Sequence, residues 1–396
     1  MAHDRQPIVT VAHSWLRERR HDPQLRLSRP APTEHADAYA GPMRPLRTEE
    51  PAPLPSLDEL LEPMRVVSLP MHTRFRGITR REAALLHGPN GWVEFSPFLE
   101  YDTAEAAAWL AGAIDAGWTP QPAPVRDRVP VNATLPAVPA GEVPAVMAHY
   151  GDLSALHTVK VKVAGEGDAL EDDRARLRAL RELVGDDVRV RIDVNGRWGL
   201  DEAFAALAQL ARFGLEYAEQ PVADVEDLAR LREQLAAHDV PVPIAADESV
   251  RKAEDPLRVA ELGAADLIIV KAQPLGGAHR VLDVVARSGL PAVVSSALDT
   301  AVGIAAGARL AAALPALDHA CGLATGALFT DDVAGRDAHG ARTAEDAAGF
   351  VHDFAITPGW VEPDEDALDR LDAGVARTGW WRERIAACHA ALAERG

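Results

Sequence analysis

Six ionisable side chains, three lysines and three carboxylates, are the residues of this chain best suited to chemistry. They are Lys160, Lys162, Asp193, Glu219, Asp247 and Lys271. The chain contains only four lysines, although lysine and arginine together number 41. An amine can exchange a proton when its pKa is shifted, whereas a guanidinium stays charged. The lysines of this set therefore indicate acid–base chemistry, and we expect the fourth, Lys252, to be a surface residue.

The spacing of this set matches the repeat of a barrel. From Lys162 onward its members are 24 to 31 residues apart, and short apolar runs precede Asp193, Asp247 and Lys271. A parallel strand and its return helix take about 30 residues in a (β/α)8 barrel, whose catalytic groups lie at the C-terminal ends of the strands. The spacing predicts that all six side chains meet at one mouth.

The three carboxylates Asp193, Glu219 and Asp247 are oxygen donors of the kind that hard divalent cations prefer. We expect Mg²⁺ at this place, with Mn²⁺ as an alternative. The absence of histidine and cysteine from these strand ends disfavours zinc. A single carboxylate at a strand end is more often a helix cap or a surface residue. Three of them at a regular spacing, together with the scarce lysines, favour a metal site.

The pair Lys160 and Lys162 is separated by one residue, so in a strand both side chains point the same way. Their mutual repulsion would lower the lysine pKa toward the range of a working base. Such a lysine could take a proton from the carbon beside a metal-held carboxylate, while the metal stabilises the resulting enediolate. An isolated lysine pair on a strand is more often an edge or ion-pair feature. The catalytic interpretation therefore depends on the whole set.

The charge and composition of the chain limit the kinds of partner that we expect for it. The formal net charge is −19, whereas nucleic-acid binders usually present a basic face. A local cation cluster or a metal still allows a small-molecule carboxylate as substrate. Two cysteines, no signal-peptide pattern and no uncharged apolar run of membrane-spanning length indicate a cytoplasmic enzyme. We expect no nucleic-acid, membrane or obligate protein partner.

An N-terminal extension and a small domain are expected ahead of the barrel. Residues 1–54 hold eight of the 29 prolines and no sustained apolar period, which predicts a mostly disordered extension. Residues 55–125 combine strands, folded at a turn signal near residues 87–91, with a helix that begins at Thr103. Because strands followed by a helix do not make a βαβ unit, we expect an α+β capping domain.

Residues 126–322 are expected to form an α/β fold, a modified TIM barrel of the (β/α)7β type. Its first strand should begin at Val129, and its last should end near Cys321. The pattern of the C-terminal segment, residues 323–396, is irregular at first and becomes helical over residues 365–394. We expect this segment to pack back against the capping domain and to close the mouth.

The chain resembles the enolase superfamily, in its muconate-lactonising subgroup. That subgroup combines a Lys-x-Lys strand, as in residues 160–162, with Asp, Glu and Asp metal ligands and a lysine on the opposite side. The resemblance covers residues 56–394. Within the superfamily, the chain is most similar to the family of actinobacterial o-succinylbenzoate synthases. Four segments carry that similarity: residues 74–82, 92–102, 129–134 and 271–277.

This resemblance implies an activity and three lysine roles. The reaction would be the Mg-dependent syn dehydration of 2-succinyl-6-hydroxy-2,4-cyclohexadiene-1-carboxylate to o-succinylbenzoate in menaquinone biosynthesis, through an enediolate. Lys162 would take the proton beside the carboxylate and return it to the departing hydroxyl. Lys271 would stay protonated and stabilise the intermediate from across the ring. Lys160 would support Lys162 and the carboxylate of the substrate.

Further residues near the strand ends follow from the same resemblance. Asn195 would orient Asp193. Arg191, one pleat before Asp193, and Ser295 and Ser296, at the end of a later strand, would contact the substrate.

Other functions could use the same residues. Two lysines on opposite faces could remove a proton from one side and replace it from the other, giving a racemase or epimerase of N-acylamino acids or dipeptides. Cycloisomerisation of muconate is a more distant alternative. A non-catalytic binding protein on a retained barrel is a rival from another class, but the complete set of six groups weighs against it. The four segments above favour the synthase over the racemase.

Overall fold

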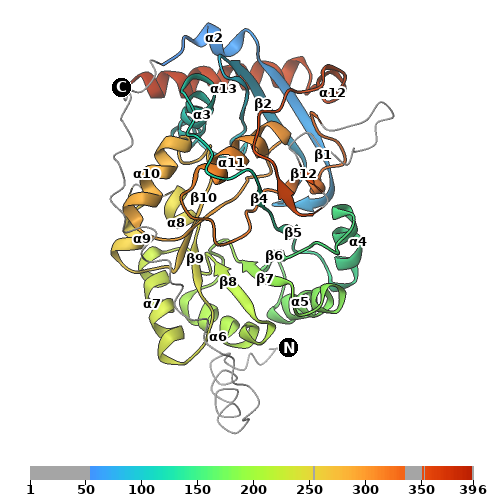
Figure 1. Ribbon diagram of the computed structural model, residues 1–396, viewed down its shortest axis with the longest axis vertical. Helices are drawn as coiled ribbons and strands as arrows, with labels where there is room; N and C mark the ends of the chain where they lie inside the picture. Colours follow the sequence, from blue (N-terminus) through green and yellow to red (C-terminus); the bar gives the residue numbers. More distant parts are fainter. Residues whose placement is uncertain (1–53, 253–254, 335–349, 352, 395–396) are drawn as a thin grey trace, which may run out of the picture.

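The computed structural model describes residues 54–252, 255–334, 350–351 and 353–394. The predicted extension, residues 1–54, therefore lies outside the described residues except for Leu54. The described chain has a barrel in the lower part of Figure 1 and a layer of strands and helices above it. The N-terminal strands and the C-terminal helices share that upper layer, although they come from opposite ends of the sequence.

The upper layer begins with an antiparallel sheet in the order β1-β2-β3. Its strands are β1 (Arg65–Phe75), β2 (Ile78–Gly88) and β3 (Gly91–Phe95). The turn signal near residues 87–91 joins β2 to β3, with His87 opposite Trp92. A short helix, α2 (Leu57–Leu61), precedes the sheet and is held by a capping box of Ser56 and Glu59. Helix α3 (Thr103–Trp118) follows it, and the Asp102 side chain caps the helix.

The barrel contains seven parallel strands in sequential order, from β5 to β11. They are β5 (Ala133–Leu135), β6 (Thr158–Lys162), β7 (Arg189–Asp193), β8 (Leu215–Glu219), β9 (Ile244–Ala246), β10 (Leu267–Val270) and β11 (Ala292–Val294). Residues 321–322 supply the eighth position, because parallel bridges join Cys321 to Val131 and Gly322 to Ser295. The (β/α)7β architecture predicted from the sequence is confirmed.

Helices lie between successive barrel strands and cover the outside of the barrel (Figure 1). They are α4 (Val143–Met147), α5 (Leu170–Val184), α6 (Leu200–Leu210), α7 (Val225–Ala237), α8 (Glu248–Arg251), α9 (Arg258–Glu261), α10 (Ala278–Ser288) and α11 (Ala301–Ala313). Each such helix turns an apolar face toward the barrel. In α10, for example, the buried residues Val281 and Val285 lie one turn apart on the same face.

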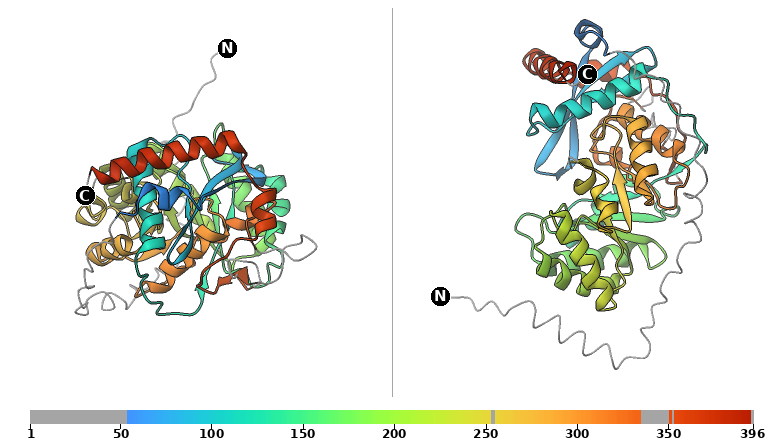
Figure 2. Two further views of the ribbon diagram at one scale, coloured as in Figure 1. Left: turned by 90° about the horizontal axis from the view of Figure 1, so that it is seen from above. Right: turned by 90° about the vertical axis from the view of Figure 1, so that its left-hand side faces the viewer.

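The C-terminal segment returns to the capping sheet. The helical stretch predicted for residues 365–394 is two helices, α12 (Glu365–Arg370) and α13 (Val375–Ala393). They are separated at Gly374, whose φ of 83° suits glycine. Helix α13 packs against α3 and β1, and Figure 2 shows it lying across the top of the molecule. A small sheet in the order β12-β13-β4 (Phe350–Val351, Ala355–Ile356 and Val129–Pro130) joins this segment to the start of the barrel.

Two large apolar cores correspond to the two layers. The first is built from the barrel strands and the helices around them, and the second is formed by the capping sheet, α3 and α13, with Trp109 and Trp381 fully buried. A third, small cluster comes from the barrel strands alone and consists of Tyr217, Ala245, Leu267, Ile269 and Val293. Helix α11 contributes to both, with Ile304 in the barrel core and Val302 in the capping core. The domain boundaries predicted at residues 125 and 322 remain proposals.

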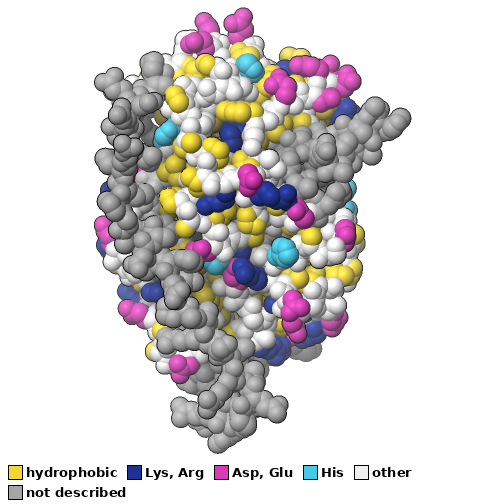
Figure 3. All heavy atoms as spheres, in the orientation of Figure 1, with side chains coloured by type: hydrophobic (Ala, Val, Ile, Leu, Met, Phe, Trp, Pro, Cys, Tyr) yellow, Lys and Arg dark blue, Asp and Glu magenta, His cyan; other side chains and the backbone are white. Residues whose placement is uncertain are grey.

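No helix among the described residues combines the length and apolar character needed to cross a bilayer. On the face shown in Figure 3, basic and acidic side chains lie among one another over its described part. That mixture differs from the continuous basic surface typical of nucleic-acid binders.

A close backbone contact holds α3 against the loop that follows β10. A Cβ atom on Gly112 would lie 2.8 Å from both the Cα and the carbonyl oxygen of Gln273. Gln273 comes two residues after Lys271, so this approach fixes the distance between the capping domain and one of the six ionisable groups. Only glycine permits it, because the atoms that would be met belong to the backbone.

Substitution of Gly112 by alanine should therefore destabilise the protein. We expect Gly112→Ala to lower the free energy of unfolding by about 2 kcal/mol, since overpacking forces the backbone to shift. The matched control is Gly379→Ala in α13, where no atom lies within 4 Å of the added Cβ and helix propensity predicts a gain of about 0.5–1 kcal/mol. Urea unfolding of both variants measures the difference, and equal effects would contradict the close contact.

Candidate active site

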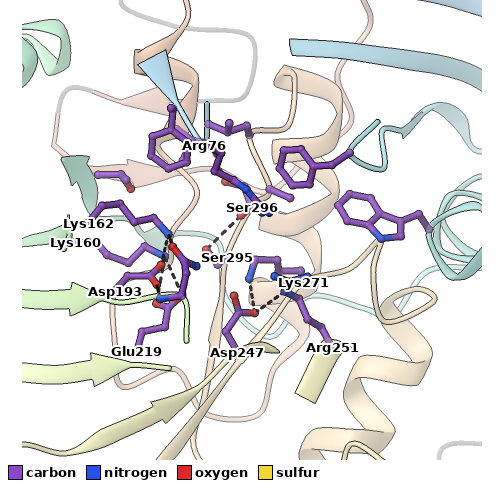
Figure 4. Close-up of a pocket in the computed structure, with 18 residues that line it drawn as sticks. Arg76, Lys160, Lys162, Asp193, Glu219, Asp247, Arg251, Lys271, Ser295 and Ser296 are labelled. Carbon is purple, nitrogen blue, oxygen red and sulfur yellow. Dashed lines mark hydrogen bonds and ion pairs between the residues drawn. The ribbon is translucent and has the colours of Figure 1, made fainter. Parts of the chain in front are cut away.

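A cavity lies between the C-terminal ends of the barrel strands and the capping domain. It encloses about 540 Å³, including space open to solvent. The barrel supplies all six ionisable residues predicted from the sequence, and the capping domain supplies Phe75, Arg76, Phe98 and Trp109. Figure 4 shows the two lysines of β6 on one side and Lys271 on the other, with carboxylates between them. The structure therefore brings the predicted set together.

The register of three neighbouring strands places one group of charges. Lys162 pairs with Asp193 and Asp193 with Glu219 across β6, β7 and β8. The Lys162 amine donates to a carboxylate oxygen of Asp193 and, over 2.9 Å, to Oδ1 of Asn195. Lys160 lies one pleat lower, and its Nζ reaches both oxygens of Glu219 at 3.2 Å. Each of these carboxylates is about 1% exposed and faces an amine.

A second group of charges surrounds Asp247 on the opposite side of the mouth. Its Oδ1 accepts from Nζ of Lys271 over 2.5 Å and from Nε of Arg251 over 3.1 Å. Arg251 also donates to Oε1 of Glu248 over 2.7 Å. The Gln220 side chain at the end of β8 accepts from the backbone N–H of Asp247 and thereby holds this turn.

Burial and these close charges raise the pKa of some groups in the site and lower the pKa of others. Burial lowers the pKa of Lys162, and the Lys160 amine adds to that effect against the opposing charge of Asp193. Burial opposes ionisation of Asp193, but the amines of Lys162 and Lys160 hold its pKa below the usual range. Burial, followed by the charge of Asp193, raises the pKa of Glu219 to about 8. Against burial, Lys271 and Arg251 lower the pKa of Asp247 to about 2.

The remaining predicted residues lie in different surroundings. Asn195 lines the cavity in a left-handed conformation with φ of 52°, which asparagine tolerates. Its backbone N–H donates to Oδ1 of Asp193 over 3.1 Å while its side chain accepts from Lys162. Ser295 and Ser296 also line the cavity. Ser296 Oγ donates to the Gly322 carbonyl over 3.0 Å, so the eighth barrel position supports it.

Arg191 is not in the cavity, so the prediction of a substrate contact there requires correction. Its side chain is fully buried inside the barrel, one pleat below Asp193. The guanidinium donates to Glu216 at 2.6 and 2.9 Å and to the Tyr217 hydroxyl at 2.8 Å. Arg191 points into the barrel, as the alternation of side chains along the strand predicts. However, it lies too far below the strand ends to reach the cavity.

Reasoning from the sequence missed several residues that line the cavity or lie next to it. Arg251 and Glu248 lie within one helical turn of Asp247, a spacing that could have identified them. Thr134 Oγ1 and Trp109 Nε1 belong to cavity residues, are buried, and have no hydrogen-bond partner within the described part of the chain. Nothing in their local sequence marks these two, because their positions depend on the closure of the capping domain over the barrel.

The donor set fits a hard divalent cation in its chemistry. Asp193, Glu219 and Asp247 are buried oxygen donors, and an oxygen of the adjacent Glu248 is buried without a partner among the described residues. In this arrangement amines lie between the carboxylates, and no group of three ligand-type side chains among the described residues is close enough to hold one ion. A cation would replace the amines as the counter-charge of the carboxylates.

Two buried acids, one from the loop after β11 and one from the capping sheet, lie near the cavity wall. Asp299 is 8% exposed and Glu94, from β3, is 3% exposed. Burial, and then the charge of Glu94, raise the pKa of Asp299 to about 7. Burial also raises the pKa of Glu94, although hydrogen bonds from Ser96 and Thr300 act in the other direction. The folded protein therefore retains protons at this contact that the unfolded chain releases.

The comparisons with known proteins agree with this fold. The chain matches the model of the enolase C-terminal domain-like family over residues 143–367 and that of the enolase N-terminal domain-like family over residues 66–117. The chain, with its capping domain over a (β/α)7β barrel, thus belongs to the enolase superfamily.

Curated relatives define the particular family. The chain is 52% identical over 340 residues to the o-succinylbenzoate synthase of Mycolicibacterium smegmatis, covering 86% of this chain and 99% of that protein. It is 51% identical to that of Mycobacterium tuberculosis, covering 86% and 97%, and 50% identical to that of Mycobacterium ulcerans, covering 87% and 98%. The chain belongs to the family of o-succinylbenzoate synthases.

Solved structures show the same fold at lower identity. The muconate lactonizing enzyme of Pseudomonas putida superposes with a TM-score of 0.62 at 19% identity, covering 78% of this chain and 98% of that chain. The 2-chloromuconate cycloisomerase of Rhodococcus opacus 1CP gives 0.61 at 21% identity, covering 78% and 98%. These likenesses concern the fold alone.

Loss of one carboxylate should abolish the stabilisation by metal. A ligand present at about 100 times its Kd stabilises the folded state by about 2.7 kcal/mol, so Mg²⁺ should raise the melting temperature of the wild type. We expect Asp193→Asn to show no such rise. Asp187→Asn, an exposed acid just before β7, serves as the control and should keep it. A full Mg²⁺-dependent shift in Asp193→Asn would remove this residue from the metal site.

The raised pKa of Asp299 predicts a dependence of stability on pH. Between about pH 4 and pH 7 the unfolded chain releases a proton that the folded protein retains, so stability falls as the pH rises. Asp299→Asn removes this ionisation and keeps an acceptor oxygen for the N–H of Ala297, which lies 3.2 Å from Oδ1. The variant should unfold at higher urea than the wild type at about pH 8, with the gain disappearing toward pH 4. A gain independent of pH would contradict the assignment.

Proposed function

We propose that this chain catalyses the Mg-dependent syn dehydration of 2-succinyl-6-hydroxy-2,4-cyclohexadiene-1-carboxylate to o-succinylbenzoate. The observation that carries the proposal is the pair of opposed amines, Lys162 and Lys271, in a cavity that also contains three buried carboxylates. The membership of the o-succinylbenzoate synthase family supplies the substrate. The enzyme is a carbon–oxygen lyase.

Lys162 is proposed as the group that moves the proton. Its amine takes the proton from the ring carbon beside the carboxylate, and the electron pair of that C–H bond passes into the carboxylate as an enediolate. The C–O bond of the ring hydroxyl then breaks while Lys162 returns the proton to the departing oxygen, so water leaves and the ring becomes aromatic. The lowered pKa of Lys162 suits this role, since a base must be neutral before it accepts a proton.

Lys271 and Lys160 are proposed to hold charge and do not move the proton. Lys271 faces the cavity from β10 while its amine is tied to Asp247, so its positive charge lies across the ring from Lys162. The neighbouring acids Glu219 and Asp193 keep the pKa of Lys160 above its usual range against the effect of burial. A lysine that stays protonated attracts the negative charge that develops on the substrate carboxylate.

Asp193, Glu219 and Asp247 would hold Mg²⁺, or Mn²⁺, at the edge of the cavity. The ion supplies Lewis-acid stabilisation of the negative charge that develops on the substrate carboxylate. Asn195 positions Asp193 and Lys162 together, because it bonds to both.

Polar groups at other walls of the cavity are proposed to contact the rest of the substrate. Ser295 and Ser296 lie at the end of β11, and Arg76 projects from the capping domain over the Phe98 ring at 4.1 Å. Thr134 Oγ1 and Trp109 Nε1 have free hydrogen-bonding capacity there within the described chain. Arg76 is the group best suited to the carboxylate of the succinyl tail, since a guanidinium can bind both of its oxygens.

The opposed lysines would equally serve a racemase or epimerase of N-acylamino acids. The three curated relatives reported above, at 50–52% identity, are o-succinylbenzoate synthases, which favours dehydration. We propose that the reaction belongs to menaquinone biosynthesis, as the family resemblance implies. Both cysteines are buried and unpaired, as is usual in a reducing compartment, so we place the enzyme in the cytoplasm.

The test of this function is an ultraviolet assay of aromatic product formation with Mg²⁺ and the cyclohexadiene acid. Lys162→Ala should lose about 10³-fold or more in kcat, because it removes the proton-transfer group. Lys271→Ala should lose about 10²-fold or more, because it removes a charge aimed at the intermediate. Lys252→Ala is the matched control, since Lys252 pairs with Glu105 away from the six groups, and it should retain full activity.

The outcomes separate the candidate functions. No turnover by a folded, Mg-loaded wild type would sink the dehydratase proposal. The same sample would then be incubated with N-acylamino acids in deuterated water, where exchange of the α-proton would identify the racemase instead.

A further inference from the structure

One buried arginine, Arg81, connects the capping domain to the barrel outside the metal site. It belongs to β2 and is 2% exposed. Its Nε donates over 3.2 Å to the carbonyl of Leu298, in the loop after β11. Its Nη2 donates to the Ser96 carbonyl of the capping domain and lies 3.4 Å from the Ala297 carbonyl. One side chain thus joins two segments more than 200 residues apart.

The loop that Arg81 holds forms part of the cavity wall. Ser296, Ala297 and Leu298 all line the cavity. Leu298 has φ of 62°, a left-handed conformation that a branched apolar residue rarely adopts unless its surroundings impose it. The hydrogen bond from Arg81 to the carbonyl of this same residue is one such constraint.

A second contact anchors the far end of this loop to the capping domain. Oε2 of Glu94 accepts from the N–H and the hydroxyl of Thr300, at 2.9 and 2.5 Å, and from the N–H of Gly303 at 3.2 Å. The acid from β3 therefore caps the N-terminus of α11. A Cβ atom on Gly303 would lie 2.6 Å from Glu94, so no larger residue fits between them.

Arg81 also touches the capping segment that forms the opposite wall. Its guanidinium lies 4.4 Å from the centre of the Phe98 ring, and Phe98 lines the cavity. The N–H of Ser96 donates over 3.1 Å to the side chain of Gln273, two residues beyond Lys271. The contacts of Arg81 therefore extend to both walls of the cavity and end near one of the lysines.

We infer that Arg81 is a positioning residue of the active site, which sets the distance between the Phe98 wall and the Leu298 wall around the part of the substrate remote from the metal ligands. The inference rests on the proposed function for its effect on catalysis. Lysine could not replace arginine here, because an ammonium group lacks the planar fork that reaches several carbonyls at once.

The expected effect is on substrate binding more than on the chemical step. Lys162, Asp193 and Glu219 lie on β6 to β8 and make no contact with Arg81. Loss of contacts to a non-reacting part of the substrate raises KM with little change in kcat. We expect Arg81→Lys to raise KM about tenfold, with kcat changed less than about threefold. The Mg²⁺-dependent shift in melting temperature should remain that of the wild type.

The matched control is the neighbouring Arg80→Lys. Arg80 is exposed on the same strand, and within the described part of the chain its side chain donates to Ser68 alone, at 2.7 and 3.0 Å. It should leave KM unchanged. Hydrogen exchange measured by mass spectrometry adds a readout that needs no turnover. Amides of residues 295–303 should exchange faster in Arg81→Lys than in Arg80→Lys, whereas those of residues 189–193 should not.

Each outcome decides the inference. Equal KM values and equal exchange in the two arginine variants overturn it, and so does loss of the Mg²⁺-dependent shift, which would make Arg81 a general folding residue. If the wild type does not turn over the substrate, the proposed function fails. The exchange experiment still tests whether Arg81 holds the loop of residues 295–303. If Arg81→Lys does not fold, Arg81→Gln takes its place, because its shorter amide side chain lacks the fork that reaches several carbonyls at once. This variant should raise exchange in residues 295–303 above that of Arg80→Lys, and unchanged exchange overturns the inference.

Discussion

The burial of three amines against three carboxylates at one end of the barrel is the interaction on which the arrangement of this molecule depends. Neither kind of charge could be removed from water alone, because an unpaired buried ion costs several kcal/mol or more. The register of β6, β7 and β8 solves this by setting Lys162, Asp193 and Glu219 side by side. Burial, together with the charge nearest to each group, also explains why the pKa of Glu219 is raised whereas that of the neighbouring Asp193 is lowered.

The capping domain gives these charges a dry environment. Its aromatic residues Phe98 and Trp109 form one side of the cavity, and the same residues belong to an apolar core shared with α13. Electrostatic interactions strengthen as water is excluded. The C-terminal helix therefore contributes to the chemistry without approaching it, because it supports the surface that covers the strand ends.

The sequence predicted the architecture and the six ionisable residues because both depend on short-range regularities. A repeat of strand and helix sets which residues end a strand, and strand ends of a parallel barrel meet. The repeat does not predict how deep a side chain lies inside the barrel. Arg191 obeys the same alternation as Asp193, but two residues along a strand amount to about 7 Å, which is enough to move it from the cavity into the interior.

Contacts across the interface of the two domains could not be predicted in this way. Arg81 meets Leu298, and Glu94 meets Thr300, over separations of 217 and 206 residues. No local sequence pattern marks either pair. Both contacts depend on how the capping sheet packs against α11 and the loop before it. The break between α12 and α13 was missed for a simpler reason, since the glycine at residue 374 was read as part of a continuous helical stretch.

The scarcity of lysine affects how readily reactive metabolites can modify the protein. Three of its four lysines lie inside the cavity with side chains 8–15% exposed, and Lys252 is the remaining one, at 38%. Acyl phosphates, thioesters and reducing sugars modify proteins chiefly through exposed amines. Because arginine supplies nearly all the other basic side chains, such reagents find few amines to attack besides Lys252 and the α-amine of the chain, so acylation at Lys160, Lys162 or Lys271 would report on entry into the cavity itself.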